Sequence, residues 1–343
     1  MNIHAAAAYA AHLMTAGSTA GHGVHSPLMF SFITEVIGGS ADKHIMDEVR
    51  SLRREMLTDS RVVRVTDLGA GSTVMDDEER SIRRIASAAA LPAREAGLLS
   101  GIAASLDSIL ERVPGQQVCG PQATSPPAKI RNATGKPAGD TQVPDQPGND
   151  QSSIDLLESH SQAIGQQVND QPGNDLRAAR PRDAGQPDNR SIILELGTSL
   201  GISTLALALG APQKKIVTVE GCPELAAIAR ENLRRHGAAN TEVLNMEFSQ
   251  ALAHLKKTGT KTEMAFIDGN HRGKALTEYA NTIMRMGEEM IIVADDIRIN
   301  RDMHKAWQTL ATFSFATASL ETFRLGMLFC LQNLTPGHYR IRY

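Results

Sequence analysis

The chain is poor in cysteine and in excess charge, and each scarcity excludes a class of protein. Its 343 residues contain three cysteines, Cys119, Cys222 and Cys330, and no C-x-x-C pair, so we expect neither a disulfide framework nor a cysteine-ligated zinc. A reduced cytoplasm is the simplest location. Lysine and arginine (35) nearly balance aspartate and glutamate (38), and this net charge of -3 predicts no nucleic-acid partner and no anionic membrane surface.

A basic leader and long apolar runs are also missing. Residues 5–14 are mildly apolar, but they lack a basic leader and are too short to span a bilayer. We therefore expect neither a signal peptide nor a membrane segment. With 41% hydrophobic residues the chain can still bury a core.

Composition divides the chain into three parts. Residues 1–112 are expected to form a mainly helical extension that packs on a catalytic domain at 191–343. Between them, residues 113–190 are rich in Gln, Pro, Gly, Asn and Asp, and Q-V-P-D-Q-P-G-N-D at 142–150 nearly recurs at 167–175. So little apolar surface cannot offset the entropy of ordering, which predicts a disordered insert; a partner-binding role is the alternative.

From residue 191 onward, strand and helix patterns alternate. We expect strands at 192–195, 216–219, 242–244, 264–267, 290–294, 315–319 and 326–331, with residues 340–343 as a further edge. This series predicts an α/β fold with a doubly wound, mostly parallel, seven-stranded sheet. Because its connection is short, the strand at 326–331 is expected to be antiparallel.

The segment I-I-L-E-L-G-T-S-L-G-I-S at 192–203 has the pattern of a strand, a glycine-rich turn and a helix. Gly197 and Gly201 suit a turn where a ligand approaches the backbone, and the first N–H groups of the helix can meet an anionic group. A plain turn in an α/β core is the alternative. At 67–72, D-L-G-A-G-S looks similar, but a charge cluster follows it, so we expect no cofactor turn there.

Acidic residues end several of the expected strands: Glu195, Glu220, Asp268, Asp295 and Asp296. In doubly wound sheets, ligands lie beyond the carboxyl ends of the strands, so these positions are candidates for a site. Glu220 ends the strand after the glycine turn, where a carboxylate can accept hydrogen bonds from ribose hydroxyls, as in NAD and S-adenosylmethionine enzymes. The turn is G-x-x-x-G rather than G-x-G-x-x-G, which disfavours a nicotinamide-dependent oxidoreductase.

Four strings resemble the successive motifs of class I S-adenosylmethionine-dependent methyltransferases: E-L-G-T-S-L-G-I-S at 195–203, V-T-V-E at 217–220, F-I-D-G-N-H at 266–271 and V-A-D-D at 293–296. They are most similar to the catechol O-methyltransferase-like branch and its bacterial small-molecule relatives. The resemblance implies a Rossmann-like sheet and methyl transfer from S-adenosylmethionine to a hydroxyl of a small molecule. A nitrogen acceptor and a non-catalytic cofactor-binding scaffold remain alternatives, and a homodimer is among the expectations.

The resemblance also implies a set of cofactor-binding residues: Glu195, Gly197, Gly201, Ser203, Glu220, Ser249 and Gln250. The backbone of the two glycines and the Ser203 hydroxyl would hold the methionine end of the cofactor. Glu220 would bind the ribose hydroxyls. The pair at 249–250 matches positions near the adenine in the catechol branch.

In the catechol branch a divalent ion, usually magnesium, is held by the counterparts of Asp268, Asp295 and Asp296, which fits the preference of hard cations for oxygen ligands. The third counterpart is normally asparagine, so Asp296 departs from the pattern; capping of the next helix is the structural alternative for the 295–296 pair. If no ion is bound, we expect Arg272, Arg298 and the cofactor's sulfonium to balance the three carboxylates.

His271 stands where the branch has a catalytic lysine. Its imidazole could take a proton from the acceptor hydroxyl near neutral pH, and hydrogen bonding to a carboxylate or substrate is the alternative. With Asp268, it is the expected catalytic residue. His22 and His25, in the turn G-H-G-V-H-S-P at 21–27, are expected to be structural because no third metal ligand is in view.

Overall fold

The computed structural model describes residues 3–65, 79–111 and 191–343, all within one compact unit. The expected insert at 113–190 and the D-L-G-A-G-S segment at 67–72 lie outside these residues.

The helices and strands before the insert are α1 (Ile3–Thr15), α2 (Pro27–Ser31), the π-helix η1 (Phe32–Ile37), α3 (Lys43–Thr58), β1 (Val62–Arg64), β2 (Glu79–Ser81), α4 (Ile82–Ala89), α5 (Ala93–Ala104) and α6 (Leu106–Leu110). Those after it are β3 (Ser191–Leu196), α7 (Ile202–Gly210), β4 (Lys215–Glu220), α8 (Pro223–Arg235), β5 (Thr241–Asn245), α9 (Phe248–Lys257), β6 (Lys261–Ile267), α10 (Gly273–Ile283), β7 (Met290–Ala294), α11 (Arg301–Ala311), β8 (Ala318–Glu321), β9 (Gly326–Cys330) and β10 (Gly337–Arg340).

In the described residues, the main sheet has the strand order β10-β8-β9-β7-β6-β3-β4-β5. Strands β3 to β7 are parallel to their neighbours among themselves, and β9 is antiparallel to both β7 and β8. The doubly wound, mostly parallel fold and its antiparallel strand are therefore confirmed. The sheet has eight strands rather than seven, because β10 pairs in parallel with the edge of β8 at 337–340, slightly earlier than the expected edge.

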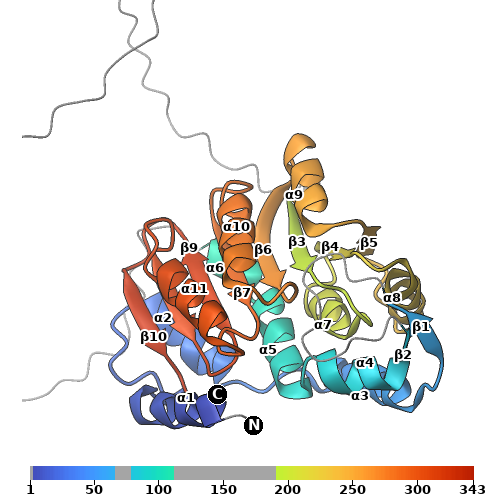
Figure 1. Cartoon of the computed structure of the whole chain (residues 1–343). Helices are drawn as coiled ribbons and strands as arrows, with labels where there is room; N and C mark the ends of the chain where they lie inside the picture. The colour runs from blue at the N-terminus through green and yellow to red at the C-terminus, as the bar shows by residue number, and fades with distance from the viewer. Residues whose placement is uncertain (1–2, 66–78, 112–190) are drawn as a thin grey trace, which may run out of the picture. The chain divides into compact units, whose positions relative to one another are not determined.

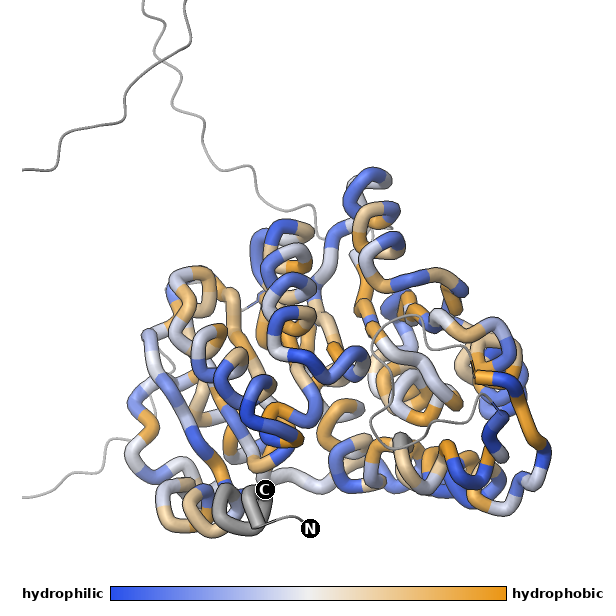
Figure 2. The backbone as a smooth tube through the Cα atoms, in the orientation of Figure 1, coloured by the Kyte–Doolittle hydropathy of each residue, from blue (hydrophilic) through white to orange (hydrophobic). Residues whose placement is uncertain are grey.

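Side chains of the central strands alternate between the two faces of this sheet. On β3, Ile192 and Leu194 join a core cluster with side chains of α9, α10 and α11, whereas Ile193 joins a cluster with α7, α8 and the helices that precede the insert. Figure 1 shows these elements around the strands, and Figure 2 shows hydrophobic residues along the central strands. The sheet is thus covered on both faces, and its carboxyl edge remains for a site.

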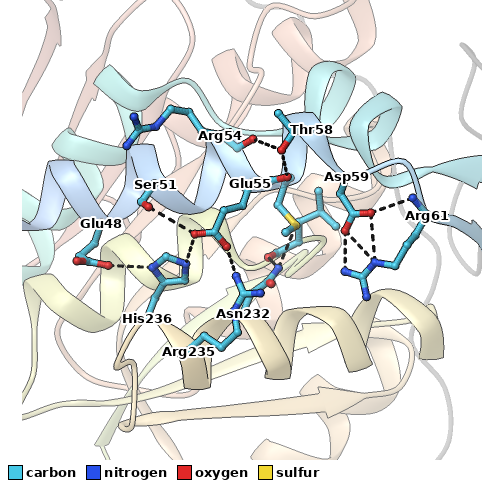
Figure 3. Close-up of polar contacts among 12 residues, drawn as sticks. Glu48, Ser51, Arg54, Glu55, Thr58, Asp59, Arg61, Asn232, Arg235 and His236 are labelled. Atoms are coloured by element: carbon cyan, nitrogen blue, oxygen red, sulfur yellow. Dashed lines mark hydrogen bonds and ion pairs between the residues drawn. The ribbon is translucent and has the colours of Figure 1, made fainter.

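The helix α3 is attached to α8 by a polar cluster behind the glycine turn (Figure 3). The ring nitrogens of His236 lie 2.8 Å from Glu48 Oε2 and 3.2 Å from Glu55 Oε1. Asn232, buried on α8, donates to the backbone oxygen of Leu200 (3.0 Å) and to the sulfur of Met56 on α3 (3.2 Å). The N-terminal helices therefore support the turn that follows β3.

The segment after α1 pairs with the segment after β10. The amide of Gly17 donates to Arg340 O (2.8 Å), and the amide of Arg342 donates to Gly17 O (2.9 Å). This contact holds the end of β10, the eighth strand, at the edge of the sheet. Among the helices of the described ranges, none has the length and apolar character required to cross a bilayer.

Candidate active site

The carboxyl ends of four neighbouring parallel strands carry most of the predicted site residues. Within the order β7-β6-β3-β4, Asp295 and Asp296 follow β7, Asp268 follows β6, the glycine turn follows β3, and Glu220 ends β4. Parallel strands present their carboxyl ends at one edge of a sheet. The structure thus gathers residues that are far apart in the sequence along this edge.

Backbone strain is concentrated at the same edge. Ser199, Asn270 and Asp296 have positive φ values of 48°, 52° and 51°, and they follow β3, β6 and β7. Such conformations cost energy in residues other than glycine and cluster at functional sites. Their coincidence on three adjacent strands identifies the edge as the candidate site.

Gly197 has to be glycine for two reasons. Its φ is +113°, and a Cβ at this position would lie 2.2 Å from the backbone oxygen of Asp268. Its amide donates to Val219 O (3.0 Å) on β4. The turn after β3 is therefore packed closely between the ends of β4 and β6.

Gly201 ends the turn and begins α7. It adopts a left-handed conformation (φ 82°) as the N-cap residue and supplies no side-chain cap. The first N–H groups of a helix without such a cap can donate to a bound group.

Glu195 is fully buried at the end of β3. Its Oε2 accepts hydrogen bonds from the hydroxyls of Thr204 (2.5 Å) and Thr218 (2.6 Å), whereas Oε1 has no partner among the described residues. Burial raises the pKa of Glu195, and the hydroxyls of Ser203, Thr204 and Thr218 offset only part of that rise. A buried acceptor without a donor is costly, so Oε1 fits a donor such as the ammonium group of a bound methionine moiety. Ser203 is itself buried in the first turn of α7.

The Glu220 carboxylate is oriented by two backbone amides. Its Oε2 accepts from the amide of Ser199 (2.8 Å), and its Oε1 accepts from the amide of Cys222 (2.9 Å). A carboxylate oxygen can accept more than one hydrogen bond, so this arrangement remains compatible with ribose hydroxyl donors. The same contacts connect Glu220 to the glycine turn.

Ser249 and Gln250 are exposed in the first turn of α9. The residue of this region that lies against the carboxyl edge is Phe248, whose ring would be 2.5 Å from a Cβ added to Gly269. The place of the 249–250 pair near an adenine stays a prediction.

Arg324, in the connection between β8 and β9, binds the carboxylates that follow β7. Its Nε donates to Asp295 Oδ1 (2.7 Å) and its Nη2 donates to Asp295 Oδ2 (2.6 Å), a two-point contact with a side chain that is 0% exposed. The same Nε lies 3.2 Å from Asp296 Oδ1. The amide of Asp296 also donates to Asp295 Oδ1 (2.7 Å). Both oxygens of Asp295 are therefore engaged.

The three carboxylates influence one another strongly. Burial, followed by the charges of Asp295 and Asp296, raises the pKa of Asp268 well above its ordinary value. Burial and the charge of Asp295 likewise raise the pKa of Asp296. Burial alone would lower the pKa of Arg324, but its hydrogen bond and charge contacts with the carboxylates raise it, so this arginine is permanently charged. Arg324 is thus the cation of the cluster.

For Arg298, the prediction that it balances the three carboxylates is wrong. Arg298 instead pairs with Glu321 (2.7 Å) and donates to the backbone oxygens of Thr322 and Phe323. Arg272 is exposed immediately before α10. The counter-charge at the carboxylates is Arg324, which was not among the predicted residues.

The carboxylates do not fit a divalent ion in this arrangement. Because Arg324 occupies both oxygens of Asp295 and approaches Asp296, an ion would have to displace a two-point, charge-assisted contact. Within the described residues, no group of three or more His, Cys, Asp or Glu side chains has a geometry suited to a metal. We therefore assign no step to a metal.

His271 follows β6 and is partly exposed. Its backbone oxygen accepts from Asn300 Nδ2 (3.2 Å). The neighbouring Asn270 donates to Tyr279 Oη (3.1 Å), and its buried Oδ1 has no partner in the described part of the chain. Two candidate acceptor-binding groups, His271 and Asn270, thus lie at the end of β6. By contrast, His22 and His25 are exposed in the turn before α2.

Three residues were not among the predicted ones: Arg324 and Asn270 at this edge, and Asn232 on α8. A signal existed for Arg324, since β9 is antiparallel to β7 and pairs Gly326 with Ala294. That register puts residues just before 326 beside those just after 294. The antiparallel strand that the sequence predicts at 326–331 already implies this proximity.

Comparison with known proteins finds similarity over the same part of the chain. Residues 194–297 match a family model described as a methyltransferase domain. A catechol O-methyltransferase from Mycobacterium tuberculosis (strain ATCC 25618 / H37Rv) is 37% identical over 108 residues, which make up 31% of this chain and 47% of that protein. The chain thus spans about half the length of this curated relative.

Solved structures resemble parts of the chain at lower identity. A cofactor-bound protein from MTB is 27% identical with a TM-score of 0.35, over 42% of this chain and 74% of the other. The O-methyltransferase TomG from Streptomyces achromogenes, in complex with SAM, is 23% identical with a TM-score of 0.37, over 41% and 73%.

The chain therefore carries a methyltransferase domain, and its motifs resemble those of class I S-adenosylmethionine-dependent enzymes. The matched residues, 194–297, include the glycine turn, Glu220, Asp268 and the Asp295–Asp296 pair.

Proposed function

We propose that this protein transfers the methyl group of S-adenosylmethionine to a hydroxyl of a small molecule. The observation that supports it most is the turn after β3, where Gly197 lies against the backbone of Asp268 and Glu195 Oε1 lacks a donor within the described residues. A cofactor with an ammonium group and ribose hydroxyls matches these groups and the neighbouring Glu220. The similarity to a catechol O-methyltransferase supports an oxygen acceptor.

Each residue of the edge has a separate task in this proposal. Glu195, the backbone of Gly197 and Gly201, and the α7 N-terminus with Ser203 would hold the methionine end. Glu220 would bind the ribose, and the start of α9, with Ser249 and Gln250, would border the adenine. S-adenosylmethionine supplies an electrophilic methyl carbon, and its sulfur leaves with the bonding electrons when the acceptor oxygen attacks in line.

The acceptor hydroxyl has to lose its proton during the transfer. We assign this proton to His271, which is partly exposed at the end of β6, directly beyond Asp268 and Asn270. Asp268, below the turn, would hold the acceptor side of the site in place through its backbone contact with Gly197. Alignment of the acceptor oxygen with the methyl group then accounts for most of the rate.

A turnover assay tests the proposal. The protein is incubated with S-adenosylmethionine and a panel of small phenols, catechols, alcohols and amines, and S-adenosylhomocysteine release is measured. We expect release with hydroxyl acceptors and a loss of about tenfold to a thousandfold in His271→Ala, which lacks the base. Release with amines alone would replace the proposal with an N-methyltransferase. Tight cofactor binding without any turnover would favour a cofactor-binding scaffold.

The cellular setting of this activity is also a proposal. Of the described cysteines, Cys222 is buried and Cys330 is partly buried, and both are free thiols. This state is compatible with a reducing cytoplasm. A small-molecule acceptor and a homodimer stay predictions.

A further inference from the structure

Arg324 is fixed in place rather than loosely paired. The buried Arg298 donates to the backbone oxygens of Thr322 (2.8 Å) and Phe323 (3.0 Å), which directly precede Arg324. The amide of Ile297 donates to the backbone oxygen of Arg324 (3.1 Å). The chain immediately after Asp295–Asp296 is therefore bound to the turn that carries the guanidinium.

The contact between Arg324 and Asp295 would be costly to break. Asp295 is fully buried, and the guanidinium matches both of its oxygens in the two-point geometry that makes such pairs strong. Removing the arginine would leave a buried carboxylate without its cation, beside Asp268 and Asp296. A cluster of three carboxylates that lacks this cation is an arrangement that attracts a divalent ion.

We propose that Arg324 is a built-in cation that takes the place of the divalent ion implied by the catechol-type motifs, so that Asp268, Asp295 and Asp296 bind no magnesium or manganese. The proposal rests on the proposed methyltransferase function for its catalytic meaning. Which cation lies at the three carboxylates can be tested without measuring turnover.

This arrangement changes which acceptors the site can use. A metal ion can chelate two adjacent acceptor oxygens, whereas a fixed guanidinium offers hydrogen-bond donors. The Nη1 group of Arg324 takes no part in the contacts with Asp295 and Asp296, and the side chain is 28% exposed. It can therefore donate to a single acceptor oxygen, so the substrate class includes compounds with one hydroxyl as well as catechols.

Calorimetric titration with Mn²⁺ tests the proposal without an acceptor or a cofactor. We expect no binding by the wild-type protein. In Arg324→Met the carboxylates lose their cation, and we expect Mn²⁺ to bind at least about tenfold more tightly than to the wild type. Arg272→Met is the matched control, because it removes an exposed arginine near the same edge, and it should remain like the wild type.

Two outcomes would overturn the proposal: Mn²⁺ binding by the wild-type protein that disappears in Asp295→Asn, or no gain of Mn²⁺ binding in folded Arg324→Met. If Arg324→Met does not fold, Arg324→Lys keeps the charge without the two-point contact, and it should bind Mn²⁺ more tightly than the wild type. An affinity of Arg324→Lys equal to that of the wild type would then overturn the proposal. S-adenosylhomocysteine titration of the same samples separates a failure of this proposal from a failure of the proposed function.

Discussion

Among single residues, Gly197 connects backbone conformation to the site most directly. Its φ of +113° and the 2.2 Å approach to Asp268 O mean that a side chain at this position cannot be accommodated without moving β6 relative to β3. Since the backbone of the turn faces the proposed cofactor, any such movement also changes the ligand-binding edge. Stability and binding therefore depend on the same residue.

We predict that Gly197→Ala lowers the free energy of unfolding by about 3 kcal/mol or more, since strain in φ adds to overpacking against a backbone oxygen. Gly237→Ala is the matched control. Gly237 also has a positive φ (76°), but its added Cβ would meet nothing within 4 Å, so about 1 kcal/mol is expected. Urea unfolding followed by circular dichroism measures both variants. Equal losses would contradict the close packing of the turn.

At the residue scale, the sequence could predict the acidic positions but not the cation that balances them. Carboxylates at the ends of apolar strands can be recognised in the sequence, because parallel strands place their carboxyl ends at one edge of the sheet. A counter-charge depends on strand pairing, and Arg324 lies on a connection far along the chain from Asp295. Arg298, which is near Asp296 in sequence, points into the β8–β9 region and binds Glu321 instead.

At the scale of elements, Glu321 connects the antiparallel side of the sheet to α11 and to the chain after β7. At the end of β8, its Oε2 accepts from Trp307 Nε1 (2.6 Å), and its Oε1 pairs with Arg298 (2.7 Å) and with Arg340 on β10. Trp307 packs in turn on Gly326, where a Cβ would be 2.6 Å from its ring. The elements that hold Arg324 thus depend on this buried network.

The same network predicts a pH dependence. Burial opposes ionisation of Glu321, but the charge of Arg298 and the hydrogen bonds from Arg340 and Trp307 outweigh it and lower the pKa of Glu321. A lowered folded pKa stabilises the protein above the unfolded pKa of about 4.3, and this stabilisation is lost as the pH falls through the folded value.

We therefore expect Glu321→Gln to cost about 3 kcal/mol at pH 7, because it leaves Arg298 buried without its carboxylate, and to cost less as the pH falls below about 4. Thermal melting across this range measures the difference. Glu278→Gln, which removes an exposed pair with Lys274, should change stability by less than about 1 kcal/mol. If Glu321→Gln lost the same stability relative to the wild type at pH 7 and below about pH 4, the proposed network would be contradicted.

Elements were predictable where periodicity was strong. The strands β3, β4, β6 and β7 occur where their apolar runs indicated, because they are buried on both faces. The eighth strand, β10, occurs at 337–340 because its pairing depends on β8 and on the chain near Gly17, which are distant in sequence. Before the insert, the helical segment at 93–110 is divided into α5 and α6 at Ser105.

At the scale of the whole molecule, the described residues contain two core clusters, one on each face of the main sheet. The N-terminal helices contribute to one of them, with Leu52 and Leu99 fully buried alongside Ile193 of β3. These helices therefore belong to the same compact unit as the strands, and removing them would expose apolar surface.

We predict that replacing residues 116–186 with a short Gly/Ser linker leaves the melting temperature and S-adenosylhomocysteine affinity almost unchanged. Residues 1–115 and 187–343 form a compact unit of their own, and shortening a loop changes its closure entropy by only about 2 kcal/mol. A longer deletion, 106–186, is the control, since it also removes the buried Leu106 and Ile109 and should destabilise the protein. Equal loss of cofactor binding in both would contradict this organisation.

The most direct measurement of the central claim is calorimetric titration of the wild-type protein, Glu220→Gln and Glu242→Gln with S-adenosylhomocysteine. We predict that the wild type binds and that Glu220→Gln loses about 1.5 to 3 kcal/mol, roughly tenfold to a hundredfold in affinity, because charge-assisted hydrogen bonds to the ribose are weakened. Glu242→Gln, on the neighbouring strand β5 and paired with the exposed Lys215, should bind like the wild type. The absence of binding by the folded wild type, or equal affinity in Glu220→Gln, would contradict a cofactor site at the carboxyl edge of β3 and β4.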